Sequence, residues 1–130
     1  MKIAADAGAV ALTIDLDSAG RAARATKGQT VEPKTPAQLK ELVKASPLPL
    51  LFKGIMTPDE AEIAIKAGAA GIVVSNHGGR TLADTPGTAA VLPRIVDKVK
   101  GRCYIMVDGT VARGTDIEKY LALGANCTFA

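Results

Sequence analysis

Residues 57–75, TPDEAEIAIKAGAAGIVVS, contain a complete helix-to-strand unit. The first four residues are typical of a helix start: Thr caps the helix, Pro occupies the first turn, and Glu60 reaches back to the cap backbone. Gly68 stands where the helix needs a left-handed stop, and the apolar run 71–75 follows closely. Because that run does not alternate with polar residues, it predicts a strand buried on both faces, as in a parallel sheet.

The same pattern recurs along the chain. A second Thr-Pro start lies at residues 35–38, a Thr115-x-x-Glu118 box predicts a further helix start, and the stop glycine returns at Gly8 and Gly124. Helices are therefore expected over residues 36–45, 58–67, about 88–100 and 116–123. Apolar runs predict five strands, at residues 10–15, 48–53, 71–75, 104–108 and 127–130. The connection 16–34 has no apolar period and is expected to be a mobile excursion above the strand ends.

Strand-helix alternation at this spacing predicts parallel strands joined by right-handed crossovers. Two architectures fit that pattern: an open doubly wound sheet and a (βα)₈ barrel. The chain has 130 residues, enough for one domain over residues 1–130, whereas a complete eight-stranded barrel takes about 250 residues. If the fold is a barrel, it is an incomplete one with about half of the strands.

Composition narrows the classes of function. The chain is 48% hydrophobic and 22% charged, as is typical of a soluble globular domain. Its net charge of +3 is scattered and its aromatic content is 3%, so we expect no nucleic-acid partner. No apolar run approaches the ~20 residues of a membrane span, and Asp6 interrupts the stretch where a secretory signal would be apolar. A cytoplasmic protein without membrane contact is therefore expected.

The two cysteines are assigned no chemistry. Cys103 and Cys127 lie in apolar surroundings without CxxC spacing or a nearby histidine. We expect them to be buried as small hydrophobic residues, with neither a metal nor a disulfide.

Polar residues stand at the ends of four predicted strands. Asp15, Lys53, Ser75 and Asp108 each close an apolar run, and the carboxyl ends of parallel strands meet at one edge, where ligands bind. Lys53 is costly to desolvate there unless it faces an anion or an electron-rich ligand. The alternative is a lysine whose ammonium group reaches past the rim into water.

His77 is the only histidine, and a lone histidine is more often structural than catalytic. Here it follows a buried strand and stands beside Asn76 and two glycines, which let the backbone approach a ligand closely. Arg80 comes three residues later, and its guanidinium fork matches a carboxylate in two hydrogen bonds. A base beside a carboxylate clamp predicts an acid as substrate.

Several strings together carry a specific resemblance to a known family. They are KGIMT at 53–57, GIVVSNHGGR at 71–80, VDG at 107–109, RGTD at 113–116 and ALGA at 122–125. The sequence resembles the FMN-dependent 2-hydroxy-acid oxidases and dehydrogenases, which include glycolate oxidase and lactate oxidase. The resemblance implies an α/β fold, an incomplete (βα)₈ TIM barrel with strands four to eight. It also implies oxidation of a small L-2-hydroxy acid, such as lactate or glycolate, to the 2-oxo acid.

The resemblance further implies a role for each strand-end residue. His77 takes a proton from the substrate, Asp15 hydrogen-bonds its imidazole, and Arg80 holds the substrate carboxylate. Lys53 lies near the flavin edge where negative charge develops on reduction. The remaining implied FMN ligands are Thr13, Ser75, Asp108, Gly109 and Arg113.

Two departures from the family pattern fall in the strand-seven segment. Thr110 replaces a second glycine, and Ala112 stands where the family has an arginine for the flavin phosphate, so the neighbouring Arg113 is the expected substitute. One hypothesis is an FMN enzyme that needs further parts of the barrel. The other is a non-catalytic half-barrel that forms a homo-oligomer or pairs with a complementing barrel half, because half a barrel exposes strand edges and an apolar inner face.

Overall fold

The computed structural model describes residues 1–20 and 32–129. Five parallel strands form one sheet: β1 (Leu12–Asp15), β2 (Leu50–Ile55), β3 (Gly71–Val74), β4 (Tyr104–Val107) and β5 (Cys127–Thr128). The described helices are α1 (Lys2–Asp6), α3 (Pro36–Ala45), α4 (Pro58–Ala67), α5 (Thr88–Val99) and α6 (Gly114–Ala122), with 3-10 turns η1 (Asp17–Gly20) and η2 (His77–Gly79).

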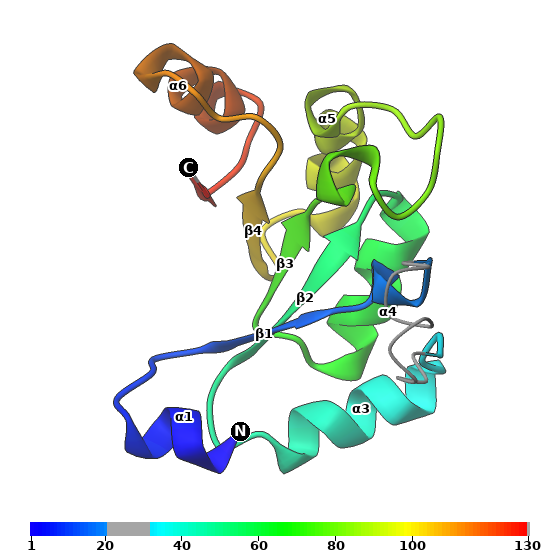
Figure 1. Cartoon of the computed structure of the whole chain (residues 1–130), viewed down its shortest axis with the longest axis vertical. Helices are drawn as coiled ribbons and strands as arrows, with labels where there is room; N and C mark the ends of the chain where they lie inside the picture. Colours follow the sequence, from blue (N-terminus) through cyan, green and yellow to red (C-terminus); the bar gives the residue numbers. More distant parts are fainter. Residues whose placement is uncertain (21–31, 130) are drawn as a thin grey trace.

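The strands follow one another in space in the order of the chain, β1-β2-β3-β4-β5. A doubly wound sheet reverses its strand order at a switch point, whereas the wall of a βα barrel does not. The structure therefore selects the second of the two predicted architectures, a partial TIM barrel. Figure 1 shows the strands side by side, with α3, α4 and α5 on one side of the sheet.

The two faces of the sheet differ in chemistry. One register row, Ile14, Phe52, Ile72 and Ile105, packs against the helices and belongs to the main apolar core. The next row consists of Asp15, Lys53, Val73 and Met106 and lies on the opposite face, because side chains alternate along a strand. Tyr104 on that opposite face is 63% exposed. The sheet thus has a helix-covered face and an open inner face that carries the charged residues.

Both Thr-Pro helix starts are confirmed in the structure. Thr35 and Thr57 each accept a hydrogen bond from the backbone three residues on, and Gln38 and Glu60 accept one in return from the cap backbone. The predicted stops are also confirmed, since Gly8, Gly68 and Gly124 all have φ between +88° and +102°. Short β-α connections of this kind fix where each strand begins and ends.

The predicted start of the last helix is wrong. The helix begins at Gly114, and the backbone N–H of Arg113 donates to the Asp116 carboxylate at 3.0 Å, so Asp116 and not Thr115 provides the capping side chain. Strand β2 also differs from its prediction, running over 50–55 instead of 48–53. Pro49 has no N–H to donate, and a bulge at Gly54 carries the pairing on to Ile55.

Both cysteines are free and half-buried, so the expectation of full burial is wrong in degree. Cys103 packs against the apolar core, and this burial raises the pKa of its thiol. On the surface nearby, the Arg102 guanidinium donates to the Glu62 carboxylate at 2.6 Å, and this hydrogen bond lowers the pKa of Glu62. None of the described helices is both long and apolar enough to cross a bilayer.

Candidate active site

A hollow of about 400 Å³ opens at the carboxyl ends of the strands. That volume is within the ordinary range of sites for small ligands and cofactors. It is lined by Lys53, His77, Gly78, Arg80, Asp108, Gly109, Thr110, Val111 and Phe129. The sequence-predicted residues of β2, β3 and β4 therefore converge on one place.

Lys53 is the cation at the base of this hollow. Its ammonium group donates to the Ser75 hydroxyl at 2.8 Å and lies 2.8 Å from Asp108 Oδ2 and 4.0 Å from Asp15 Oδ1. The Lys53 side chain is only 18% exposed. The ammonium group does not reach past the rim into water, and its desolvation is offset by ion pairing within the site.

His77 has an unusual backbone and a buried ring. Its φ is +52°, a left-handed conformation that histidine tolerates better than most residues, and the side chain is 7% exposed. The His77 N–H donates to the hydroxyl of the fully buried Ser75 at 3.2 Å. Asn76 accepts from Gly78 N–H and donates to the Pro86 carbonyl, which ties the turn to the following loop. Strained backbone of this kind is typical of functional sites.

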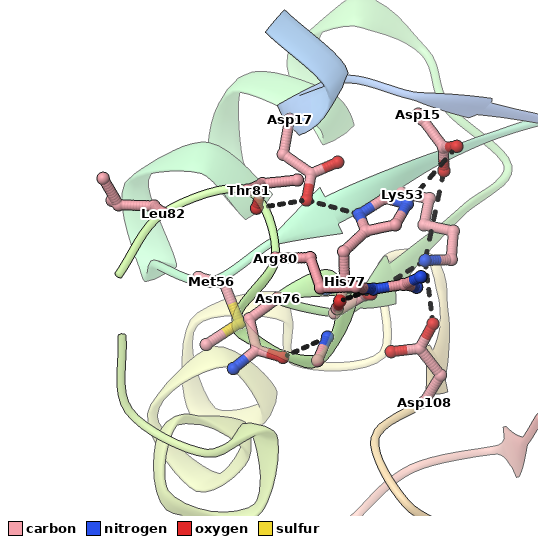
Figure 2. A network of polar contacts seen from close by, with 12 residues as sticks. Asp15, Asp17, Lys53, Met56, Asn76, His77, Arg80, Thr81, Leu82 and Asp108 are labelled. Atoms are coloured by element: carbon pink, nitrogen blue, oxygen red, sulfur yellow. Dashed lines mark hydrogen bonds and ion pairs between the residues drawn. The ribbon is translucent and has the colours of Figure 1, made fainter. Parts of the chain in front are cut away.

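Two carboxylates face the two ring nitrogens of His77 (Figure 2). Asp17 Oδ2 is 2.6 Å from Nδ1, and Asp15 Oδ2 is 3.4 Å from Nε2. Asp15 lies near the imidazole as predicted, but the hydrogen bond to the ring is made by Asp17, which was missed. Its sequence signal is a second acid two residues after the strand-end Asp15.

Asp17 is held in place by its neighbours. The Thr81 hydroxyl donates a hydrogen bond to Asp17 Oδ2 at 3.3 Å, and the backbone of Gly54 lies close to the Asp17 side chain. A Cβ at Gly54 would lie 2.5 Å from Asp17 Cγ, far inside contact distance. Asp15, Asp17 and His77 bring three potential metal-ligand atoms within 4.8 Å of one another. The 2.6 Å separation is nevertheless that of a charge-assisted N–H···O hydrogen bond, so we interpret the group as a hydrogen-bonded pair with a second acid nearby.

Arg80 supplies the second cation of the hollow. Its Nε–H donates to the His77 carbonyl at 2.8 Å, which holds the guanidinium beside the imidazole. Among the described residues, no hydrogen bond occupies its two terminal NH₂ groups. Since Lys53 is already paired with Asp108, Arg80 is the cation left to bind an incoming carboxylate.

The turn after β4 is fixed by a buried polar network. Thr88 donates its hydroxyl to the Asp108 carbonyl at 2.9 Å and lies 2.9 Å from the Tyr120 hydroxyl, which donates to the Gly109 carbonyl at 3.2 Å. One oxygen of the Asp108 carboxylate pairs with Lys53. The other, Oδ1, is buried without a partner among the described residues. It is a ready acceptor for a hydroxyl group of a ligand.

The remaining sequence-predicted ligands lie farther out. Thr13 is exposed on β1, two residues before Asp15 and on the same face. Arg113 is exposed and occupies the N-cap position of α6, just after the hollow-lining residues Thr110 and Val111. Most of the predicted connection 16–34, residues 21–31, lies outside the described residues. The structure thus brings Asp15, Lys53, His77, Arg80 and Asp108 together and leaves Thr13 and Arg113 at the margin.

Comparison with known proteins identifies the family. The model of the FMN-dependent dehydrogenase family matches residues 6–130. The chain belongs to this family of FMN-dependent 2-hydroxyacid oxidases. Within the family, it is 53% identical over 88 residues to the 2-hydroxyacid oxidase of Dictyostelium discoideum, covering 68% of this chain and 23% of the relative. It is 45% identical over 102 residues to glycolate oxidase 3 of Arabidopsis thaliana, covering 78% and 28%.

Solved structures of the family agree with the fold of this chain. It superposes on mandelate oxidase in complex with benzoyl-formic acid with a TM-score of 0.85 and 33% identity, covering 99% of this chain and 43% of that one. The chain therefore spans less than half the length of the relatives that it matches. As the family name states, its members use FMN.

The residues of this chain fit that cofactor in part. The unpartnered Asp108 Oδ1 suits a ribityl hydroxyl, and the Lys53 ammonium suits the flavin edge that gains negative charge. In the turn after β4, where the resemblance implies a phosphate contact, Gly109, Thr110 and Val111 line the hollow and no arginine of that turn does. The fit is thus strong for the ring and ribityl parts and weaker for the phosphate.

Proposed function

We propose that the chain forms the catalytic edge of an FMN-dependent oxidoreductase that converts a small L-2-hydroxy acid of the lactate or glycolate type to its 2-oxo acid. The observation that carries this proposal is the convergence of a base, His77, and an unmatched guanidinium, Arg80, in one hollow beside Lys53. A 2-hydroxy acid has a carboxylate that can pair with the guanidinium, and the adjacent carbon carries the hydroxyl and the hydrogen that a base can act on.

Each residue then has a distinct task. The terminal NH₂ groups of Arg80 bind the substrate carboxylate and thereby direct the 2-carbon toward the imidazole. His77 Nε2 takes the proton from the hydroxyl or from the α-carbon, and the resulting imidazolium is stabilised by the Asp15 carboxylate at 3.4 Å. FMN, when bound, would accept the two electrons together with the second hydrogen that the substrate loses. Lys53 provides the positive charge that balances those electrons, and Asp108 keeps the ammonium in place.

The direct test is the visible absorption spectrum of the purified chain with added FMN, followed by L-lactate and then glycolate under anaerobic conditions. A bound flavin whose visible band bleaches with one of the two acids is the expected result if this chain forms a working site without further parts of the barrel. Bovine serum albumin with FMN serves as the control for unspecific flavin retention. A chain that retains no flavin would exclude the proposal for this polypeptide by itself.

Arg113 is proposed to contact the FMN phosphate in place of the arginine that the family carries one residue earlier. Hydrogen bonds to charged groups contribute about 1.5–3 kcal/mol each, so Arg113→Ala is expected to weaken FMN binding about 10- to 100-fold. Fluorescence titration of FMN measures the dissociation constant. Arg94→Ala removes the same charge from an exposed position on α5 and is the matched control. An unchanged FMN affinity in Arg113→Ala would rule out the contact.

A second candidate is a non-catalytic half-barrel that pairs with another copy of itself. The observation in its favour is the open inner face, where Tyr104 is 63% exposed and Phe129 is 47% exposed. Exposed apolar surface of this kind favours association. Sedimentation of the chain with and without FMN distinguishes the candidates: a dimer that retains no flavin supports this one, and a flavin-binding species that is reduced by substrate supports the enzyme.

A further inference from the structure

Asp17 is the residue that the family resemblance does not assign and that lies closest to the catalytic base. Its Oδ2 atom is 2.6 Å from His77 Nδ1, whereas Asp15 Oδ2 is 3.4 Å from Nε2 (Figure 2). The first distance is that of a strong N–H···O⁻ hydrogen bond, and the second is longer than ordinary hydrogen bonds. Asp17 therefore interacts with the imidazole ring more strongly than Asp15 does.

We propose that Asp17 is a positioning residue that fixes the tautomer of neutral His77, holding the proton on Nδ1 so that the lone pair stands on Nε2. A neutral imidazole carries one N–H, and the nitrogen that has it is set by the hydrogen bond which it makes. A carboxylate has oxygen acceptors and no N–H of its own to donate. The Nδ1 atom must therefore be the donor in this pair.

The surroundings of Asp17 restrict its side chain. Gly54, with φ of +95°, lets the Asp17 side chain lie where a Cβ would collide with it, and Thr81 donates a second hydrogen bond to the same Oδ2 atom. The side chain of Asp17 is 18% exposed, against 32% for Asp15. Neighbours on two segments, β2 and the loop after η2, thus restrict the Asp17 side chain, which is also less exposed than that of Asp15.

The assignment divides the work between the two acids. While His77 is neutral, Asp17 keeps the basic lone pair on Nε2, the nitrogen that faces Asp15. When Nε2 takes a proton, Asp15 becomes its acceptor, and the imidazolium then lies between two carboxylates. The other charged groups near the ring are Lys53 on β2, Arg80 after η2 and Asp108 on the turn after β4. Lys53 bridges Asp15 and Asp108, so neither of these competes for Nδ1.

This role in the reaction rests on the proposed function, but the tautomer is a property of the chain itself. His77 is the only histidine, so a two-dimensional ¹H–¹⁵N spectrum of the imidazole region of the uniformly ¹⁵N-labelled full chain contains the signals of one ring. The spectrum is recorded at a pH where the ring is neutral. We expect the Nδ1 shift to be that of a protonated nitrogen and the Nε2 shift to be that of an unprotonated one.

The matched variants are Asp17→Ala and Asp15→Ala. Asp17→Ala is expected to lose the Nδ1–H signature and to move the proton toward Nε2, whereas Asp15→Ala keeps the wild-type pattern. Asp17→Asn, which preserves the shape of the side chain, is the second variant if Asp17→Ala does not fold. It is expected to reduce the Nδ1–H population, because an amide can also donate to Nδ1, as the corresponding Asp→Asn change does in serine proteases.

The proposal is overturned if wild-type His77 carries its neutral proton on Nε2, a result that needs no variant at all. It is equally overturned if Asp15→Ala, and not Asp17→Ala, changes the tautomer. A chain that shows the Nδ1–H form but binds no FMN would refute the proposed function and leave the Asp17 assignment standing. A chain whose His77 has the Nε2–H form and whose flavin is reduced by substrate would support the proposed function and refute the Asp17 assignment.

Discussion

Replacing His77 with Gln is expected to slow reduction of bound flavin by the 2-hydroxy acid about 10²- to 10⁴-fold, the ordinary contribution of a general base. The dissociation constant of FMN is expected to stay unchanged. Gln retains a polar side chain of similar size but cannot take up a proton at neutral pH. The hollow keeps Lys53 and Asp108, whose 2.8 Å ion pair does not involve the imidazole. Anaerobic stopped-flow absorbance and FMN titration measure the two quantities separately.

The control for this variant addresses the backbone. His77 has φ of +52°, so a Gln at this position is strained, and strain alone could disturb the site. His77→Asn removes the base equally but tolerates the left-handed conformation far better. We expect both variants to lose flavin reduction to the same extent. Recovery in His77→Asn would mean that backbone geometry, and not proton transfer, carries the effect.

Local signals explain why most of the fold could be predicted from the sequence. Thr35 and Thr57 each begin a helix because their caps involve residues only three positions apart. The same locality misled the prediction for α6, where Thr115 and Asp116 are adjacent candidates for a cap. Asp116 was selected because its carboxylate reaches the backbone N–H of Arg113. The spacing of the residues alone does not show whether Thr115 or Asp116 caps the helix.

The site residues on strands could be predicted for a different reason. Parallel strands end at one edge, so Lys53 and Asp108 were expected to meet there, and their ammonium and carboxylate do. Asp17 lies beyond the strand in a 3-10 turn, whose direction depends on the bulge at Gly54 in another strand. The contact of Tyr120 could likewise not be predicted, because its hydroxyl reaches the Gly109 carbonyl only through the turn that leads into α6. The periodicity of apolar residues in the sequence does not predict contacts that depend on loop geometry.

Gly54→Ala is expected to lower the free energy of unfolding by about 2–4 kcal/mol, the largest loss of stability that we predict for a single methyl group. Two effects add at this position. The φ of +95° is unfavourable for any residue with a Cβ, and that Cβ would lie 2.5 Å from Asp17 Cγ and 2.6 Å from Asp17 Oδ1. Urea denaturation followed by circular dichroism gives the change from the shift of the midpoint.

Gly68→Ala separates these two effects. Gly68 has a similar φ of +90°, but a Cβ there would meet only Val43 at 3.5 Å, an ordinary contact. Gly68→Ala is therefore expected to lower the free energy of unfolding by only about 1 kcal/mol, the part due to backbone conformation. Asp17→Gly, which removes every Asp17 atom near the new methyl group, should recover part of the loss in the Gly54→Ala background, since residues in contact are not additive. Equal losses for Gly54→Ala and Gly68→Ala, without recovery in the double variant, would place Asp17 elsewhere. Asp17 could then not fix the His77 ring. The stability effect at Gly54 and the tautomer of His77 therefore both depend on the position of the Asp17 side chain.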